Sequence, residues 1–213
     1  MIVEMQFIEA KSRAVAAVED RFAAALAGRT RLSPLGGFWR SEVGLLNQCI
    51  AVWPYASIDE RDRVRREEKK LEGWPPDLAE LVLRQHARLY RAAPFSPPIE
   101  PRALGRLYEI RRYQYAPGEI PGVIAAWSEI IGERMKRSPF VGAWYSEDGP
   151  AHEWVHVWAY ESYEARERTR DAVARAGIWP ISVVDRRLGR APRAVSLRME
   201  NMLVVPARFS PLH

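Results

Sequence analysis

The chain repeats one phrase at a fixed offset, and this feature constrains its fold more than any other. The stretch SEVGLLNQCIAVWPYASIDER begins at Ser41, and SEDGPAHEWVHVWAYESYEAR begins at Ser146, an offset of 105 positions. The same register extends upstream to Glu4, which falls on Glu109. Chance does not hold a register over such a length, so we infer that one structural unit is present twice.

A proline-rich segment joins the two predicted repeats. We place the first repeat at residues 1–98 and the second at residues 99–213, with the linker at residues 95–102 (FSPPIEPR). Proline lacks a backbone N–H and fixes φ, so this segment disfavours both a helix and a central strand. Toward the end of each repeat the register slips, which predicts an insertion in the second repeat around residues 186–194.

Hydrophobic periodicity within each repeat predicts the order strand, helix, strand, strand, helix, strand. The first helix of each repeat has apolar residues at helical spacing: Val15, Val18, Phe22, Ala25 and Leu26, then Ile120, Val123, Trp127, Ile130 and Ile131. The predicted strands are residues 2–8, 35–42, 47–55 and 88–95, with 107–115 and 195–205 as outer strands of the second repeat. This order is the ferredoxin-like βαββαβ fold, an α+β fold whose helices cover one face of an antiparallel sheet.

Turn and cap residues support these element boundaries. Gly44 and its counterpart Gly149 lie between the two central strands, where a hairpin needs a residue that accepts positive φ. Ser57, with Glu60 three residues later, has the form of a capping box that opens the second helix. Ser162 repeats the cap position without the acid, so there only the cap itself is predicted.

The strands do not alternate between apolar and polar residues, although a half-exposed sheet should. In HEWVHVWAY, one face holds Val155, Val157 and Ala159, and the other holds Trp154, His156, Trp158 and Tyr160. Exposing large aromatic side chains such as Trp53 and Trp158 would cost about 2 to 3 kcal/mol each. We therefore expect the tryptophan-bearing faces to be free of helices, and the two sheets to pack face to face on them as a barrel. The barrel could close within one chain or between chains.

Composition excludes several classes of function. No window of the 213 residues approaches the roughly 18 apolar residues of a membrane span, and the start lacks signal-peptide features, so we expect a cytoplasmic protein with no membrane partner. The net charge of +5 comes from arginines that alternate with acids, as in residues 59–72, which is not typical of a nucleic-acid surface. The single cysteine, Cys49, rules out a disulfide framework, and no cofactor motif is present.

Two motifs resemble a known family. The opening YEIRRY…PG at residues 108–118 and the core G-x-W-x-S-E-x-G…V-W-x-Y-x-S…R, which occurs in both repeats, are similar to the NIPSNAP family of the dimeric α/β barrel superfamily. The resemblance covers nearly the whole chain. It implies ferredoxin-like repeats that form a dimeric α/β barrel, assembly as a homodimer or higher homo-oligomer, and no defined activity. Wider relatives include cofactor-free monooxygenases, haem-binding enzymes and small binding modules.

The opening motif is complete only in the second repeat, so we place the candidate site there. The first repeat lacks counterparts of Arg111, Tyr113, Pro117 and Gly118. Polar groups that converge among aromatic walls are typical of small-molecule pockets. The candidate catalytic residues are His156 and Arg111, and the expected ligand-binding residues are Glu109, Tyr113, Trp144, His152, Trp158 and Tyr160.

Several of these residues have structural alternatives. His156 could act as a general base or a metal ligand, or it could be a buried histidine hydrogen-bonded to a neighbour such as Glu109 or Tyr113. Arg111 could hold the anionic group of a ligand, or it could only pair with Glu109. The pattern leaves open which face of the second strand Trp144 occupies.

Features that both repeats share are interpreted as structural. Glu42 and Glu147 precede the hairpin glycine in the two repeats, and we expect them to pair with Arg61 and Arg166. The tryptophans common to both repeats are expected to pack in the core.

We therefore predict a barrel protein that binds a small, partly apolar ligand between its sheets, without nucleic acid, metal or cofactor. The first alternative is a cofactor-independent monooxygenase or isomerase of small aromatic or polyketide-like molecules. In that case His156 removes a proton, Arg111 holds the resulting anion, and Trp158 and Tyr113 sandwich the ring. The second alternative is a structural or interaction protein with a filled barrel.

Overall fold

The computed structural model describes residues 1–146 and 152–213. The first repeat runs β1 (Ile2–Ala10), α1 (Val15–Arg29), β2 (Gly37–Val43), β3 (Gln48–Tyr55), α2 (Ile58–Glu68) and β4 (Val82–Ala92). The second runs β5 (Leu107–Gln114), α3 (Ile120–Met135), β6 (Phe140–Tyr145), β7 (Glu153–Tyr160), α4 (Tyr163–Arg175), α5 (Ile181–Arg187) and β8 (Arg198–Pro206). The predicted βαββαβ order is confirmed, and α5 is an addition to it. Each helix of the described residues lacks the length or the apolar character that crossing a membrane requires.

Antiparallel pairing joins the strands in the order β1-β3-β2-β8-β5-β7-β6-β4, and this order closes into a barrel. The fold class expected from the sequence is therefore confirmed. The chain divides into two compact units, and each unit includes a short segment of the other sequence repeat. Unit 1 comprises residues 1–91, 99–103 and 202–213, and unit 2 comprises residues 92–98 and 104–201.

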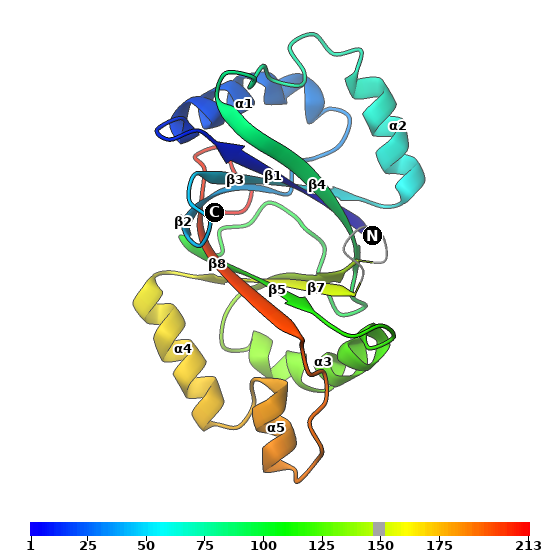
Figure 1. The fold of residues 1–213 in the computed structure, drawn as a ribbon, viewed down its shortest axis with the longest axis vertical. Coiled ribbons are helices and arrows are strands. Elements are labelled where there is room, and N and C mark those ends of the chain that lie inside the picture. The colour runs from blue at the N-terminus through cyan, green and yellow to red at the C-terminus, as the bar shows by residue number, and fades with distance from the viewer. Residues whose placement is uncertain (147–151) are drawn as a thin grey trace. The chain divides into compact units, whose positions relative to one another are not determined.

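In unit 1, α1 and α2 cover one face of the sheet (Figure 1). Its strands follow the order β4-β1-β3-β2-β8. Phe22 of α1 lies at the centre of the buried cluster, with its ring 4.7 Å from that of Phe38 and 5.4 Å from that of Trp74. The strand residues beneath it come from alternate positions of β3: Cys49, Ala51, Trp53 and Tyr55.

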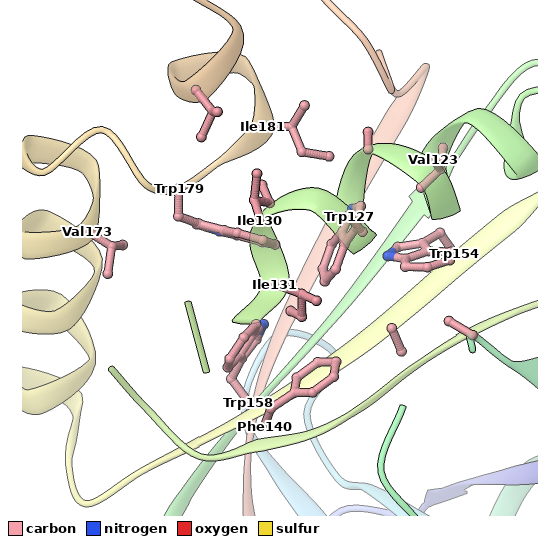
Figure 2. Packing of buried hydrophobic residues seen from close by; sticks show 14 of the residues in the cluster. Val123, Trp127, Ile130, Ile131, Phe140, Trp154, Trp158, Val173, Trp179 and Ile181 are labelled. Atoms are coloured by element: carbon pink, nitrogen blue, oxygen red, sulfur yellow. The ribbon is translucent and has the colours of Figure 1, made fainter. Parts of the chain in front are cut away.

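In unit 2, α3, α4 and α5 lie on one side of the β5-β7-β6 sheet (Figure 1). Trp127 of α3 is surrounded by other aromatic rings (Figure 2), at 5.1 Å from Trp154 and 4.6 Å from Trp179. Trp158 joins the same cluster, 5.9 Å from Trp179. Every residue of β7 is buried, so both faces of this strand are shielded from water.

In both units the helices cover the sheet face that carries the tryptophans of the second central strand, β3 or β7. Trp53 packs beneath α1, and Trp154 and Trp158 pack beneath α3. The prediction that this face is free of helices is therefore wrong. Alternation along a strand shows which side chains share a face, but it does not show which of the two faces the helices cover.

Side-chain caps open the second helix of each repeat, as predicted. Ser57 Oγ accepts a hydrogen bond from the backbone N–H of Glu60 (3.1 Å), and the Glu60 carboxylate accepts from the N–H of Ala56 (2.5 Å). Ser162 Oγ accepts from the N–H of Ala165 (3.2 Å). These bonds satisfy backbone donors that the first turn of a helix leaves without partners.

The predicted turn and linker also match the structure. Gly44 has a φ of 114°, which a residue with a side chain rarely adopts. Its counterpart Gly149 lies outside the described residues. Residues 95–102, all of which the structure describes, contain no helix or strand, and only an isolated bridge joins Arg102 to Leu212.

Two boundaries differ from the prediction. β4 begins earlier than the predicted 88–95, because residues from Val82 onward pair with β1 through backbone groups that need no apolar alternation. The insertion predicted around residues 186–194 overlaps the end of an additional helix, α5, which starts directly after Pro180 and ends at Arg187.

Candidate functional site

β5 and β7 bring most of the predicted site residues onto one face of unit 2. Antiparallel pairing sets Arg111 opposite His156, and the ring of Tyr113 lies 5.1 Å from the His156 ring. This face packs against α3, with the Trp127 ring 4.7 Å from His156. The members of this β5–β7 cluster are Glu109, Arg111, Tyr113, His156, Trp158 and Tyr160.

His156 is buried and neutral. The indole N–H of Trp158 donates to His156 Nδ1 (2.9 Å), so the proton of the neutral ring is on Nε2. That nitrogen is buried and has no hydrogen-bond partner among the described residues. Burial, followed by the positive charges of nearby arginines, holds the pKa of His156 well below its ordinary value. The partner is therefore Trp158 instead of the two neighbours that the sequence suggested, and the ring offers no free lone pair in this arrangement.

Glu109 is completely buried at the centre of several guanidinium groups. Its closest partner is Arg166 of α4, whose Nη2 donates to Oε1 at 2.6 Å. Arg170 and Arg111 approach the carboxylate at 3.5 and 3.6 Å. The predicted pair between Glu109 and Arg111 is present, but it is the longest of the three contacts.

The arginines that both repeats share bind carboxylates of the first strand. In unit 1, Arg61 of α2 donates to Glu4 of β1 at 2.5 Å, as Arg166 does in unit 2. Glu42 instead lies 3.5 Å from Arg40. The prediction that Glu42 pairs with Arg61 is therefore wrong, and Glu147 lies outside the described residues.

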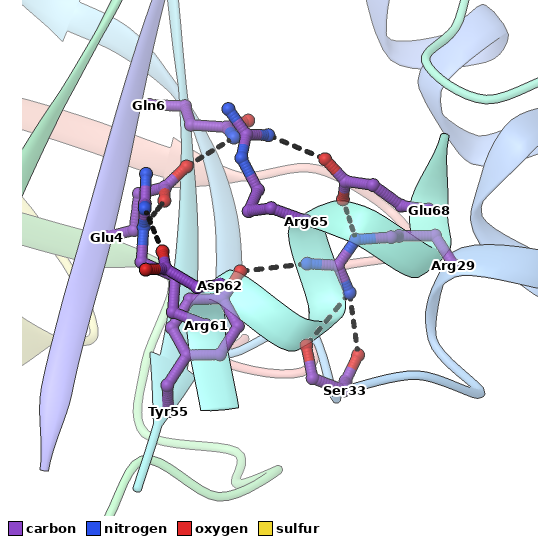
Figure 3. A network of polar contacts seen from close by, with 9 residues as sticks. All are labelled: Glu4, Gln6, Arg29, Ser33, Tyr55, Arg61, Asp62, Arg65 and Glu68. Atoms are coloured by element: carbon purple, nitrogen blue, oxygen red, sulfur yellow. Dashed lines mark hydrogen bonds and ion pairs between the residues drawn. The ribbon is translucent and has the colours of Figure 1, made fainter. Parts of the chain in front are cut away.

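Sequence reasoning missed a buried arginine at the end of the first helix. In unit 1, Arg29 donates to Ser33 Oγ (2.8 Å), to Tyr55 Oη (2.9 Å) and to Glu68 (2.6 Å), as Figure 3 shows. Its guanidinium carbon lies 4.1 Å from the centre of the Trp53 ring. The available signal was an arginine kept in both repeats at the end of an apolar helix stripe.

Arg134 takes the same place in unit 2, with one partner fewer. It donates to Ser138 Oγ (2.6 Å) and to Tyr160 Oη (3.0 Å). Val173 occupies the position of Glu68, and the Nε–H of Arg134 is buried without a partner in the part of the chain that the structure describes. Burial lowers the pKa of Arg134.

Trp144 does not belong to the β5–β7 cluster. Its neighbours Ala143 and Tyr145 pack with the residues beneath the helices, so Trp144 points to the opposite face of β6. Its ring lies over Gly142, where an added Cβ would be 2.5 Å from the ring. The structure therefore shows which face of this strand Trp144 occupies, which the sequence pattern had left open.

His152 also lies outside the cluster and lines a cavity of about 460 Å³. We call this space the hairpin-mouth cavity of unit 2. Its walls include Ile120, Pro121 and Ile124 of α3, with Tyr145, Ser146 and His152 from the strand ends. The lining is mainly apolar, with a few polar groups at one side.

Unit 1 has a cavity of about 450 Å³ at the equivalent position. Its lining residues include Glu19, Arg40, Glu42 and Asn47. Arg40 lies 3.4 Å from Glu19 and 3.5 Å from Glu42, so ion pairs occupy this lining. The two copies of the cavity are thus alike in place and volume but different in chemistry.

The barrel of two ferredoxin-like repeats is the fold of dimeric α/β barrel proteins. A candidate monooxygenase of Fusobacterium nucleatum has a TM-score of 0.67 to this chain at 6% identity, covering 96% of this chain and 91% of that one. A candidate monooxygenase of Lactobacillus acidophilus has a TM-score of 0.60 at 10% identity, covering 96% and 92%. At such identities the likeness shows the fold alone.

The family follows from sequence similarity over both repeats. The NIPSNAP family model matches residues 3–97 and 108–211. The NipSnap homolog of Dictyostelium discoideum is 31% identical over 189 residues, which are 86% of this chain and 80% of that protein. NipSnap homolog 1 of Danio rerio is 24% identical over 180 residues, and the match spans 83% of this chain but only 62% of that protein. This chain therefore belongs to the NIPSNAP family.

Proposed function

We propose that this NIPSNAP protein binds a small, partly apolar ligand in the hairpin-mouth cavity of unit 2. The volume of about 460 Å³ is within the range of about 300 to 1,000 Å³ that small-molecule pockets occupy. Ile120, Pro121 and Ile124 supply an apolar wall, and Tyr145 and His152 supply polar groups. Apolar walls hold such a ligand, and a few polar groups orient it.

The difference between the two copies of the cavity carries this proposal. In unit 1, Arg40 forms ion pairs with Glu19 and Glu42. Unit 2 has Tyr145 in place of Arg40 and Ile124 in place of Glu19. Both members of one ion pair are replaced together by less polar residues, while the volume stays similar. The change favours an apolar occupant in unit 2 only.

His152 contributes a hydrogen-bonding ring at this site. It has a φ of 62° in the turn directly before β7, and its counterpart Asn47, directly before β3, has a φ of 56°. Asparagine and histidine tolerate this left-handed backbone better than most residues do. The exchange therefore keeps the backbone conformation and places an imidazole, which can donate or accept a hydrogen bond, beside the apolar wall.

Binding of N-phenyl-1-naphthylamine, a neutral apolar fluorescent probe, tests the proposal. We expect a saturable rise in probe fluorescence with one site per chain. The double variant Ile124→Glu/Tyr145→Arg installs the unit 1 residues and should abolish this binding while the circular dichroism spectrum is unchanged.

The matched control makes the reverse exchange in unit 1. Glu19→Ile/Arg40→Tyr should add a second site per chain, because it removes the ion pair from the other cavity. A folded Ile124→Glu/Tyr145→Arg variant that binds the probe as tightly as the unaltered chain would refute the proposal.

A second candidate function is the oxidation or isomerisation of a small aromatic molecule at the β5–β7 cluster. The convergence of Arg111, Tyr113 and His156 supports it, since an anion-holding group, a ring and a titratable group lie together. In this function Nδ1 of His156 would have to release the Trp158 N–H before it could accept a proton. Oxygen consumption and product formation with a panel of phenols would test it. His156→Ala should abolish turnover without unfolding the chain, whereas an interaction protein would show neither turnover nor probe binding.

A further inference from the structure

The two copies of the buried polar network differ in charge. In unit 2 one carboxylate, that of Glu109, is surrounded by the guanidinium groups of Arg111, Arg134, Arg166 and Arg170. In unit 1 two buried carboxylates, those of Glu4 and Glu68, share the guanidinium groups of Arg29, Arg61 and Arg65. A third carboxylate, that of the half-exposed Asp62, also contacts Arg61 at 3.0 Å. The excess of positive over negative charge is therefore larger in the network of unit 2 than in that of unit 1. Figure 3 shows the network of unit 1.

Two exchanges between the repeats produce this difference. Gln6 of unit 1 donates to the Glu4 carboxylate at 2.8 Å, and its counterpart in unit 2 is Arg111. The counterpart of Glu68 is Val173. One exchange adds a cation and the other removes an anion, so both shift the balance in the same direction.

Several donors of the unit 2 network have no acceptor. Among the residues that the structure describes, the Nε atoms of Arg111, Arg134 and Arg166 are buried without a hydrogen-bond partner, and so is Nε2 of His156. Buried cationic donors are unfavourable unless an anion or a hydrogen-bond acceptor satisfies them. The network of unit 2 is therefore incomplete by itself.

Arg111 and Arg170 are the most exposed arginines of the unit 2 network. Their side chains are 17% and 34% exposed, whereas that of Arg166 is 12% exposed and Arg134 is buried. Both approach Glu109 at 3.5 Å or more, which is too long for a strong hydrogen bond, so their N–H groups can bind a second acceptor. The guanidinium of Arg111 also lies 5.4 Å from the ring centre of Tyr113.

We propose that Arg111 and Arg170 form a binding site for a small oxyanion, the carboxylate or phosphate group of a metabolite, beside the ring of Tyr113. A guanidinium group offers parallel donors that match both kinds of oxyanion. The added anion balances the excess positive charge of the network. The site shares no residue with the hairpin-mouth cavity and does not rest on the function proposed above.

Titration of the full chain with inorganic phosphate, and separately with acetate, tests this site at constant ionic strength set by chloride. We expect a saturable rise in unfolding temperature and saturable shifts of arginine Nε–H resonances, because a ligand that binds only the folded state stabilises it. Arg111→Gln, which installs the unit 1 residue, should lower the association constant by about tenfold to a hundredfold. The anion with the larger association constant identifies the chemical class of the ligand.

Variants in both units make the result specific. Arg65→Gln removes the unit 1 counterpart of Arg170 and should leave anion binding unchanged. Arg170→Gln removes a partly exposed side chain and carries the test if Arg111→Gln does not fold. The proposal is overturned if neither anion gives a saturable response. It is also overturned if the Arg170→Gln variant binds both anions as tightly as the unaltered chain does. Binding of the apolar probe should survive either change, which separates this site from the cavity.

Discussion

Trp158 and His156 are joined by a hydrogen bond of 2.9 Å between the indole N–H and Nδ1, two residues apart on β7. The bond fixes the tautomer of the buried imidazole. The counterparts in unit 1 are Trp53 and Ala51, and there no described residue accepts a hydrogen bond from the indole N–H. Unit 2 therefore buries a titratable ring where unit 1 buries only a methyl group.

Folding stability should depend on pH through His156. Its pKa in the folded chain lies well below the unfolded value of 6.5, so protons bind preferentially to the unfolded chain. The stabilisation is complete above about pH 6.5 and is lost as the pH falls toward the folded pKa, at up to about 1.4 kcal/mol per pH unit. Urea denaturation between about pH 7 and pH 5 measures this slope.

The variant His156→Gln provides the control, because an amide oxygen can still accept the Trp158 N–H but does not titrate. The free energy of unfolding of this variant should fall less steeply with decreasing pH. Identical slopes for the two proteins would rule out His156 as the source.

Glu68→Val should destabilise unit 1 strongly. The change leaves the buried Arg29 guanidinium without the carboxylate it now contacts at 2.6 Å, and losing one partner of a buried pair costs about 3 to 5 kcal/mol. Glu67→Gln removes the neighbouring exposed contact with Lys70 (2.9 Å) and should have a much smaller effect. Equal shifts in the urea midpoint would contradict this account.

Two glycine variants of unit 2 should change stability in opposite directions. Gly142→Ala places a Cβ 2.5 Å from the Trp144 ring and should cost about 1 to 3 kcal/mol through overpacking. Gly132→Ala in α3 meets nothing within 4 Å and should stabilise the helix by about 0.5 to 1 kcal/mol. Thermal unfolding of the two variants checks the signs, and a stabilising Gly142→Ala would show that the ring can move aside.

Trp127 should be the most sensitive aromatic residue of α3. Its ring lies within 5.1 Å of the rings of Trp154, His156 and Trp179. Trp127→Ala should cost about 3 to 5 kcal/mol because it leaves a cavity. Trp127→Phe installs the residue of unit 1, Phe22, and should cost less than half as much. If both variants lost a similar free energy of unfolding, the size of the indole ring would determine the stability, and a smaller aromatic ring could not replace it.

Much of the fold could be read from local features of the sequence. The offset between the repeats predicted the duplication, and periodicity predicted the order of strands and helices because both depend only on spacing along the chain. Ser57 and Gly44 marked a helix start and a hairpin through their own backbone chemistry. Alternation also indicated which of the residues Arg111, Tyr113 and His156 share a strand face. They meet on the face that packs against α3, and not between the sheets as the sequence had suggested.

By itself, then, the sequence determined the repeats, the order of their elements and the sharing of faces within each strand. Only the tertiary structure decided that the helices cover the tryptophan-bearing face, because a period of two is the same for either face. It also decided the partners of the buried charges, such as Glu109 with Arg166 and Arg29 with Glu68, because these groups come from elements far apart in the chain. Their pairing follows from distance in space, which local spacing does not encode.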